Sequence, residues 1–231
     1  MPQTWMITGA NRGIGLAIAT ELLRRGDHVI AAARDPQAKA LAELAAAYPG
    51  QFTPLALDVT SDASVAAAKE ALAGRAIDVL LNNAGLYGPR DHQSGLDVDF
   101  GAWREVFEVN VYAPLRVAQA FLSNVEAGNG RKIATISSRM GSLGANPGNA
   151  LIYRSSKAAV NMTMVVFGNA VRSSNVTVLL LHPGWVQTDM GGGGADITPA
   201  ESAAGLIRTI DASGMAETNS FRDYKGEKIA W

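Results

Sequence analysis

An apolar run, a glycine cluster and the start of a helical pattern follow one another in Trp5-Met6-Ile7-Thr8-Gly9-Ala10-Asn11-Arg12-Gly13-Ile14-Gly15-Leu16-Ala17-Ile18. An apolar run ends at Thr8, and a helical pattern begins near Gly13. Glycines at such a junction let the backbone turn sharply and approach a pyrophosphate closely. The start of the helix adds unpaired N–H groups and the positive end of the helix dipole. A glycine cluster alone could be only a tight turn, but its position between the first strand and the first helix favours nucleotide binding.

Strand-like and helix-like patterns alternate along the whole chain. The predicted strands are residues 5–8, 28–33, 52–57, 79–82, 132–137 and 176–182. The predicted helices are residues 13–25, 36–47, 61–73, 103–126, 151–172 and 199–210. This alternation predicts an α/β fold with a doubly wound parallel sheet and helices on both faces. We find no repeat or linker that divides the chain, so residues 1–231 are predicted to form a single domain.

Composition indicates a globular protein and excludes several classes of function. The chain has 231 residues, of which 48% are hydrophobic and 18% charged, and a net charge of −1. This charge gives no sign of a nucleic-acid or anionic-membrane partner. The lack of cysteine excludes disulfides and thiol catalysis and fits a reducing compartment. We find no signal-peptide pattern and no apolar run long enough to span a membrane, and we therefore expect a cytoplasmic protein.

Three polar residues form the set of groups needed to move a proton. Tyr153 and Lys157 are four residues apart, which places them on one face of a helix. An ammonium beside a phenol lowers the phenol pKa from its usual value of about 10. The hydroxyl of Ser138 could hold a carbonyl or alcohol oxygen against that phenol. Taken alone, Tyr-x-x-x-Lys also arises by chance, as a half-buried tyrosine beside a solvated lysine.

Polar motifs follow most of the predicted strands, at the point where each strand ends. Ligands of parallel sheets bind beyond the carboxyl ends of the strands, so these motifs are expected to meet at one edge. They are Thr8, residues 33–35, Asp58, residues 82–85, Ser137 with Ser138, and Pro183 with Gly184. The alternatives are a helix cap for Asp58 and a plain turn for residues 82–85.

Six motifs together resemble the short-chain dehydrogenase/reductase family. They are Thr8-Gly-x-x-x-Gly-x-Gly15, Asn82-Asn83-Ala84-Gly85, Asn110, Ser138, Tyr153-x-x-x-Lys157 and Pro183-Gly184. They occur in the family's order, and the resemblance covers residues 3 to at least 205. Residues 137–142 and 183–192 further resemble the C-factor/sniffer-like and carbonyl-reductase branch. The resemblance implies a Rossmann fold and hydride transfer between a nicotinamide cofactor and a carbonyl or alcohol substrate.

The resemblance also assigns expected roles to four catalytic residues. Tyr153 would be the general acid in reduction and the base in oxidation, and Lys157 would lower its pKa and hold the nicotinamide ribose. Ser138 would fix the substrate oxygen; Ser137 competes for this role, but the second serine matches the family pattern. Asn110, a polar residue within an apolar helical stretch, would hold a water that links Lys157 to solvent.

The predicted cofactor-binding residues extend from the glycine turn to the segment after the sixth strand. They are Thr8, Gly9, Asn11, Arg12, Gly13, Ile14, Gly15, Arg34, Asp58, Val59, Asn83, Ala84, Gly85, Tyr153, Lys157, Pro183, Gly184, Val186 and Thr188. By resemblance, Asp58 meets the adenine amino group, and Thr188 contacts the carboxamide or phosphates. A loop cap is the alternative for Thr188.

The end of the second strand indicates which nicotinamide cofactor is used. An acid near this point often holds the ribose 2′-hydroxyl of NAD. Here Ala33 occupies the expected position, and Asp35 comes one place too late. Arg34 and Arg12 could instead pair with a 2′-phosphate through charge-assisted hydrogen bonds. NADP(H) is therefore the predicted cofactor.

Two long loops are predicted to shape the substrate site. They are residues 86–101 and 183–198, and the second contains four consecutive glycines from Gly191 to Gly194. We expect residues 183–198 to act as a lid, with a passive spacer as the alternative. Together with residues 142–149, these loops would determine specificity for a small-molecule carbonyl or alcohol.

Other functional readings are weaker. His28, His92 and His182 lack metal-ligand spacing, so no metal site is predicted. A homodimer or homotetramer is compatible with the family resemblance. Two alternatives to an enzyme remain open: a regulator that binds NADP(H) and reports its redox state, and a signalling protein similar to C-factor. The complete Ser/Tyr/Lys/Asn set favours the enzyme, because binding alone does not need Tyr153.

Overall fold

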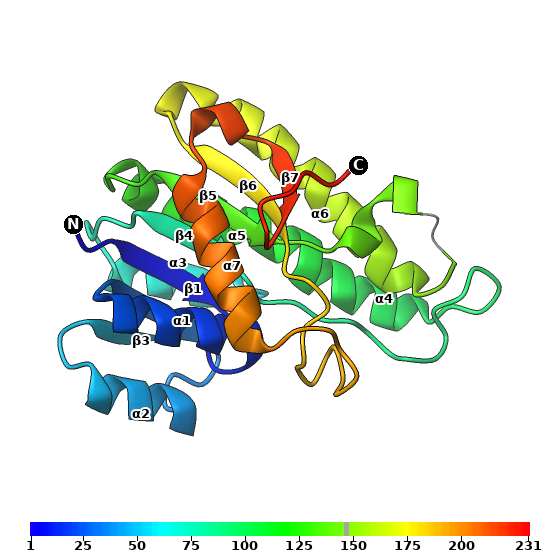
Figure 1. Cartoon of the computed structure of the whole chain (residues 1–231), viewed down its shortest axis with the longest axis horizontal. Helices are drawn as coiled ribbons and strands as arrows, with labels where there is room; N and C mark the ends of the chain where they lie inside the picture. The colour runs from blue at the N-terminus through cyan, green and yellow to red at the C-terminus, as the bar shows by residue number, and fades with distance from the viewer. Residues whose placement is uncertain (146–147) are drawn as a thin grey trace.

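The computed structural model of the chain describes residues 1–145 and 148–231. Within them, parallel strands form one seven-stranded sheet in the order β3-β2-β1-β4-β5-β6-β7 (Figure 1). The strands are β1 (Thr4–Thr8), β2 (His28–Ala33), β3 (Phe52–Ala56), β4 (Val79–Asn82), β5 (Lys132–Ile136), β6 (Thr177–His182) and β7 (Ser220–Asp223). The predicted doubly wound α/β fold is confirmed.

The order of the strands places a crevice at the centre of the sheet. The chain builds outward from β1 through β2 to β3, then returns to add β4 on the other side of β1. Helices that leave β1 and β4 therefore lie on opposite faces, and the carboxyl ends of these two strands are the point where the topology switches. The register pairs Ile7 with Ala31 on one side and with Leu81 on the other.

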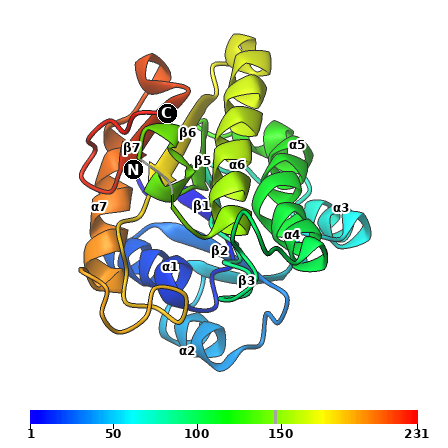
Figure 2. The same ribbon diagram turned by 90° about the vertical axis from the view of Figure 1, so that its right-hand side faces the viewer.

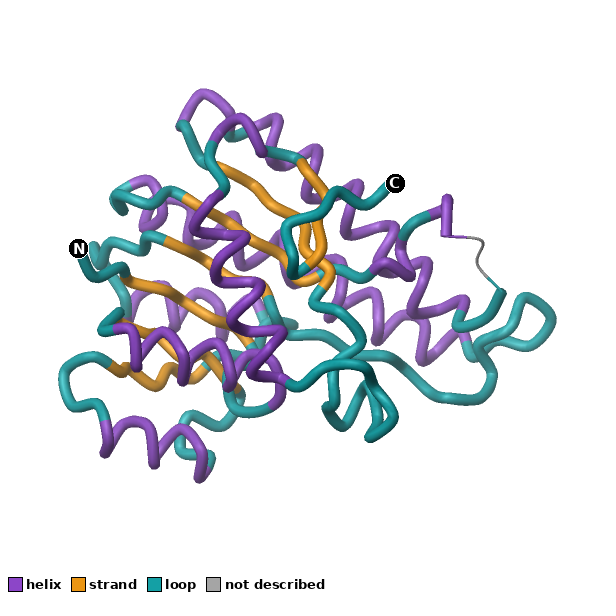
Figure 3. The backbone as a smooth tube through the Cα atoms, in the orientation of Figure 1, coloured by secondary structure: helices purple, strands orange, loops and turns teal. Residues whose placement is uncertain are grey.

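Helices cover both faces of the sheet (Figures 1 and 2). On one face lie α1 (Gly13–Arg25), α2 (Lys39–Ala47) and α7 (Pro199–Ala212). On the other face lie α3 (Asp62–Ala71), α5 (Ala113–Glu126) and α6 (Leu151–Ala170), with α4 (Phe100–Phe107) at the end of α5. Figure 3 shows the long loops gathered beyond the carboxyl ends of the strands, away from the N-terminus.

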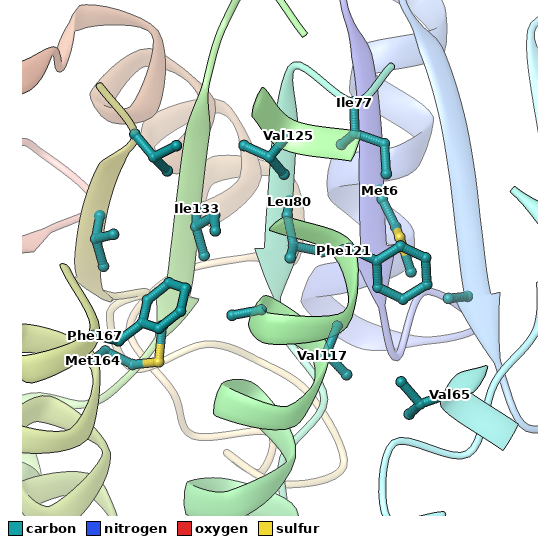
Figure 4. Close-up of a cluster of buried hydrophobic side chains, with 14 of the residues drawn as sticks. Met6, Val65, Ile77, Leu80, Val117, Phe121, Val125, Ile133, Met164 and Phe167 are labelled. Atoms are coloured by element: carbon teal, nitrogen blue, oxygen red, sulfur yellow. The ribbon is translucent and has the colours of Figure 1, made fainter. Parts of the chain in front are cut away.

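Each face of the sheet has its own buried apolar cluster. Phe121 of α5 is fully buried and packs with Met6 and Leu80 of the central strands (Figure 4). On the opposite face, Trp5 and Leu22 belong to the second cluster and are also fully buried. Burial of a large apolar side chain contributes about 1.5–3 kcal/mol. The two clusters together hold the central strands, and with them the crevice, in a fixed position.

Capping groups fix the start of two helices. Ser61 caps α3, accepting a hydrogen bond from the Ser64 N–H, and Asp62 follows in the first turn. Thr198 and Glu201 form a reciprocal capping box at the start of α7, with Pro199 in the first turn. The cap fixes where the segment 183–198 ends.

The predicted helix 103–126 differs from the structure. It begins earlier, at Phe100, where Asp99 accepts hydrogen bonds from two first-turn N–H groups. A π-helical turn, Glu108–Tyr112, then separates α4 from α5, and the N–H of Ala113 donates to the carbonyl of Glu108. Pro114 follows and has no N–H to donate, which helps to explain why regular α-helical bonding breaks at this point.

Strand β7 was not predicted. Its four residues include a single apolar side chain, Phe221, and they form the edge of the sheet beside β6, with a further bridge from Arg222 to Lys228. None of the helices among residues 1–145 and 148–231 is long and apolar enough to cross a membrane. In the predicted specificity segment 142–149, Asn146 and Pro147 lie outside the described residues.

Candidate active site

The glycine turn is fastened to the end of strand β4. The hydroxyl of Thr8 accepts hydrogen bonds from the N–H groups of Asn83 and Ala84 at 3.0 and 3.1 Å. The side-chain amide of Asn83 donates to the carbonyls of Thr8 and Gly9 at 2.9 and 3.1 Å. These bonds join the ends of β1 and β4, so the two predicted motifs form one structural unit at the crevice.

Glycine is required at two positions of this turn. Gly9 has a φ of +65°, and a Cβ there would lie 3.0 Å from the Cα of Ala84. A Cβ on Gly15 would lie 2.5 Å from both the Gly9 carbonyl oxygen and the Asn83 amide nitrogen. Helix α1 begins at Gly13, and the side chain of Arg12 makes no cap hydrogen bond. The first N–H groups of α1 therefore remain available to a ligand.

Basic and acidic groups surround the outer end of the turn. Arg34 follows β2 and is exposed, while the Arg12 guanidinium lies 3.0 Å from the Asp189 carboxylate. Asp58 accepts two hydrogen bonds from Thr60, which lower its pKa, and the charge of Arg34 lowers it further. Because Ser61 caps α3, the helix-cap alternative for Asp58 is wrong.

Helix α6 carries Tyr153 and Lys157, and both side chains are buried. The ammonium of Lys157 lies 5.6 Å from the centre of the Tyr153 ring and donates a 2.9 Å hydrogen bond to the Ile136 carbonyl. Ser138 precedes a short 3₁₀ turn, Arg139–Gly141. Its hydroxyl accepts a 3.2 Å hydrogen bond from the Met140 N–H and lies close enough to the Tyr153 phenol to affect the phenol pKa. The end of β5 and the start of α6 thus bring the three groups together.

The two neighbouring serines have different surroundings. The Ser137 hydroxyl donates to the Asn161 side-chain oxygen at 2.6 Å, within the core beneath Lys157. This hydrogen bond ties the Ser137 hydroxyl to α6. The hydroxyl that lies beside the phenol belongs to Ser138, the serine chosen from the sequence.

Burial controls the protonation of the tyrosine and the lysine. It raises the pKa of Tyr153 to about 12, although the hydrogen bond with Ser138 acts in the opposite direction. It lowers the pKa of Lys157 to about 8. The net pKa of Tyr153 lies above that of a free phenol because the loss of hydration outweighs the hydrogen bond with Ser138. The lowering of this pKa by Lys157 stays a prediction. The phenol stays protonated at neutral pH.

Asn110 lies in the π-helical turn and is almost completely buried. Its amide nitrogen donates to the Leu86 carbonyl at 2.7 Å and to the Ser156 hydroxyl at 3.0 Å, and its oxygen accepts from the Leu86 N–H at 2.8 Å. A Cβ on Gly85 would lie 3.3 Å from the Asn110 oxygen and 3.7 Å from the Lys157 nitrogen. Asn110 thus fixes the chain after Gly85 next to the lysine.

A cleft of about 1750 Å³ connects the glycine turn with the tyrosine and the lysine of α6. Its lining runs from the glycine turn and Arg34 to Tyr153 and Lys157, and it includes most of the predicted cofactor residues. Among the described residues, the predicted ones outside this lining are Thr8, Gly15, Asn110, Ser138, Gly184 and Val186. Tyr87 also lines the cleft; it belongs to the loop 86–101 that was expected to shape the substrate site, but it was not singled out, although an aromatic residue two places after Gly85 was the available signal.

The segment 183–198 borders the cleft and is fastened at its base. Val186 and Ile197 form a bridge, and the Trp185 ring N–H donates to the Gly191 carbonyl at 2.9 Å. A Cβ on Gly192, Gly193 or Gly194 would meet no atom within 4 Å. In the part of the chain that the structure describes, no cluster of three or more acidic or histidine side chains could hold a metal ion.

Comparison with known proteins identifies the family. Residues 3–196 match the family model described as short chain dehydrogenase. The chain is 42% identical to C-signal of Myxococcus xanthus over 161 residues, which is 67% of this chain and 93% of that protein. It is 36% identical to 1-hydroxy-2-glutathionyl-2-methyl-3-butene dehydrogenase of Rhodococcus sp. (strain AD45), across 99% of both chains.

A solved structure with the same fold is that of NADPH-bound carbonyl reductase from chicken fatty liver. The TM-score is 0.90 at 32% identity, with 100% of this chain and 99% of that chain covered. The chain belongs to the short-chain dehydrogenase/reductase family. Its likeness to C-signal and to a carbonyl reductase agrees with the branch that the sequence motifs resemble.

Proposed function

We propose that this protein is an oxidoreductase that transfers a hydride between NADP(H) and a small carbonyl or alcohol substrate. The observation that carries the proposal is the cleft, which runs from the glycine turn at one end to the buried Tyr153 and Lys157 at the other, with Ser138 beside Tyr153. The NADPH-bound carbonyl reductase of the same fold supports the choice of cofactor.

The residues present fit a nicotinamide dinucleotide phosphate. Gly9 and Gly15 let the turn pack closely against the end of β4, where a Cβ would meet Ala84 or Asn83, and the first turn of α1 offers N–H groups for a pyrophosphate. Arg34 and Arg12 provide positive charge for a 2′-phosphate. Asp35, the acid nearest the position used by NAD-binding proteins, accepts a 2.9 Å hydrogen bond from the Gln37 N–H in a local turn.

The chain's own residues supply orientation and proton transfer. When bound, the nicotinamide cofactor supplies or accepts the hydride. In reduction, the protonated Tyr153 donates its proton to the substrate oxygen, and the Ser138 hydroxyl holds that oxygen in place. Lys157 contributes a positive charge beneath the phenol. Asn110 holds the backbone of Leu86 and, in the proton relay, the water that links Lys157 to solvent.

The experiment that tests this function is a panel of aldehydes, ketones and quinones, followed at 340 nm with NADPH and NADH. We expect turnover of at least some carbonyls and a preference for NADPH of at least tenfold, which corresponds to about 1.4 kcal/mol. Arg34→Ala should reduce this preference by about tenfold, because a guanidinium–phosphate pair is lost. Arg208→Ala, which removes an exposed arginine on α7, is the control. Equal or tighter binding of NADH by the wild type would contradict the NADP(H) assignment.

The same panel distinguishes a signalling or sensing role. The 42% identity to C-signal of Myxococcus xanthus favours this second candidate. Tight NADPH binding without turnover on any carbonyl would support a regulator that reports cofactor redox state. The chain also retains a buried Tyr153 phenol with its Ser138 partner, which a pure binding protein does not require.

Residues 183–198 are expected to form a lid over the bound cofactor. The glycines 192–194 give this segment high conformational freedom, and Thr188 and Asp189 line the cleft near the glycine turn. Hydrogen exchange of peptides covering residues 185–197 should slow when NADP⁺ is added. The ion pair between Arg12 and Asp189 joins the glycine turn to this segment, so it should rearrange when the lid moves. If the glycine turn 8–15 gains protection while this segment does not, the segment is a passive spacer.

A further inference from the structure

Gln93 is a buried polar residue in the loop between β4 and α4. Its side-chain oxygen accepts a 3.2 Å hydrogen bond from the Tyr153 N–H, and its main-chain oxygen accepts a 2.8 Å bond from the Leu151 N–H. Both donors belong to the first turn of α6, where N–H groups have no partner within the helix. Ala150, the residue before α6, has no side chain that could cap them. Gln93 therefore caps the catalytic helix from 60 residues away in the sequence.

The other end of the Gln93 side chain holds its own loop. Its amide nitrogen donates to the carbonyls of Pro89 and Tyr87, the second at 3.5 Å. Asn110 holds the preceding residue, Leu86, through both its N–H and its carbonyl. The backbone of Tyr87 is thus fastened from both sides, by Asn110 and by Gln93.

The result of this double attachment is a contact between two tyrosine rings. The centres of the Tyr87 and Tyr153 rings lie 4.8 Å apart with an angle of 33° between the planes. This separation is within the favourable range for aromatic pairs, which contribute about 0.5–1.5 kcal/mol beyond burial. Gly88 follows closely between α4 and α6, since a Cβ there would lie 3.1 Å from Val106 and 3.7 Å from Ile152.

We infer that Gln93 is a positioning residue, which holds the Tyr87 ring against Tyr153 and thereby fixes the orientation of the phenol for proton transfer. The inference rests on the proposed function, because it concerns the group that would protonate the substrate. Gln93 acts through its hydrogen bonds to α6 and to the Tyr87 segment, and Tyr87 acts through ring contact. A small rotation of the phenol matters because proton transfer needs hydrogen-bond distance and alignment.

The test is a double-mutant cycle of Gln93→Met and Tyr87→Ala, measured on a carbonyl that the wild type reduces. Each single variant should lower kcat about tenfold while the NADPH Kd stays within about twofold. The kcat of the double variant should lie within about twofold of the kcat of the slower single variant, since both changes release the same ring. Tyr87→Phe keeps the ring and should retain kcat near that of the wild type.

A matched control is Gln51→Met. Gln51 is also a partly buried glutamine whose amide donates to a loop carbonyl, that of Gly26, but it precedes β3 at the opposite edge of the sheet. This variant should leave kcat unchanged. Losses that multiply in the double variant, or a Tyr87→Ala variant with wild-type kcat, would overturn the inference.

A measurement without substrate separates this inference from the proposed function. Gln93→Met should speed hydrogen exchange in peptides covering residues 86–93 and the first turn of α6, compared with wild type and Gln51→Met. Unchanged exchange there would refute the attachment even if the enzyme is active. A wild type that reduces no carbonyl would refute the proposed function, while faster exchange in Gln93→Met would still support the attachment.

Discussion

Carbonyl reduction by a Tyr153→Phe variant should show kcat lowered by about 10²-fold or more, the usual scale for loss of a general acid. The substitution keeps the ring and its contact with Tyr87 but removes the proton that is donated to the substrate. Burial raises the pKa of Tyr153 to about 12, so the wild-type phenol is fully protonated near neutral pH and ready to act as an acid. NADPH binding, measured by fluorescence, should change by less than about twofold.

Tyr112→Phe is the matched control for this experiment. Tyr112 is exposed at the end of the π-helical turn, so loss of its hydroxyl should leave kcat unchanged. In the oxidative direction the same phenol must first lose its proton, and the wild-type rate should therefore rise with pH. A Tyr153→Phe variant that keeps near wild-type turnover on a good substrate would show that another group protonates the product.

The fold could be predicted because its signals are local. The spans 13–25, 28–33 and 79–82 have the same bounds in the sequence analysis and in the structure, since each is a continuous apolar or amphipathic run. β7 lacked such a signal, because Phe221 is the single apolar residue among its four. This strand is defined by its pairing with β6, which the local sequence does not report. The π-helical turn depends on a bond from Ala113 to Glu108, which no helical periodicity reveals.

The site could be predicted only in part, for a physical reason. Parallel strands bring their carboxyl ends to one edge, so motifs such as Thr8 and Asn83 were expected to meet there, and they do. The pKa of Tyr153 depends on how much surrounding protein excludes water, which motif spacing does not report. The link from Gln93 to α6 spans a long loop whose path only the folded chain defines.

Substitution of Lys157 should have the second large effect on kcat. Lys157→Met is expected to lower kcat by about 10²-fold, because the positive charge that favours proton release and return is lost. It should also weaken NADPH binding about tenfold, since the same ammonium lines the cleft next to Tyr153. Tyr153→Phe, in contrast, should affect kcat alone, so the pair of variants separates proton transfer from cofactor binding.

The pH dependence gives an independent check on Lys157. Burial lowers the pKa of Lys157 to about 8, so its charge is present below that pH and is lost above it. The wild-type kcat/KM for NADPH should therefore fall as pH rises through about 8, and this fall should be absent in Lys157→Met.

A buried ammonium with a lowered pKa destabilises the folded state near neutral pH, because the unfolded chain binds the proton more tightly. Lys157→Met should accordingly keep or raise the Tm at pH 7, and a large drop in Tm would indicate that the lysine is needed for folding instead.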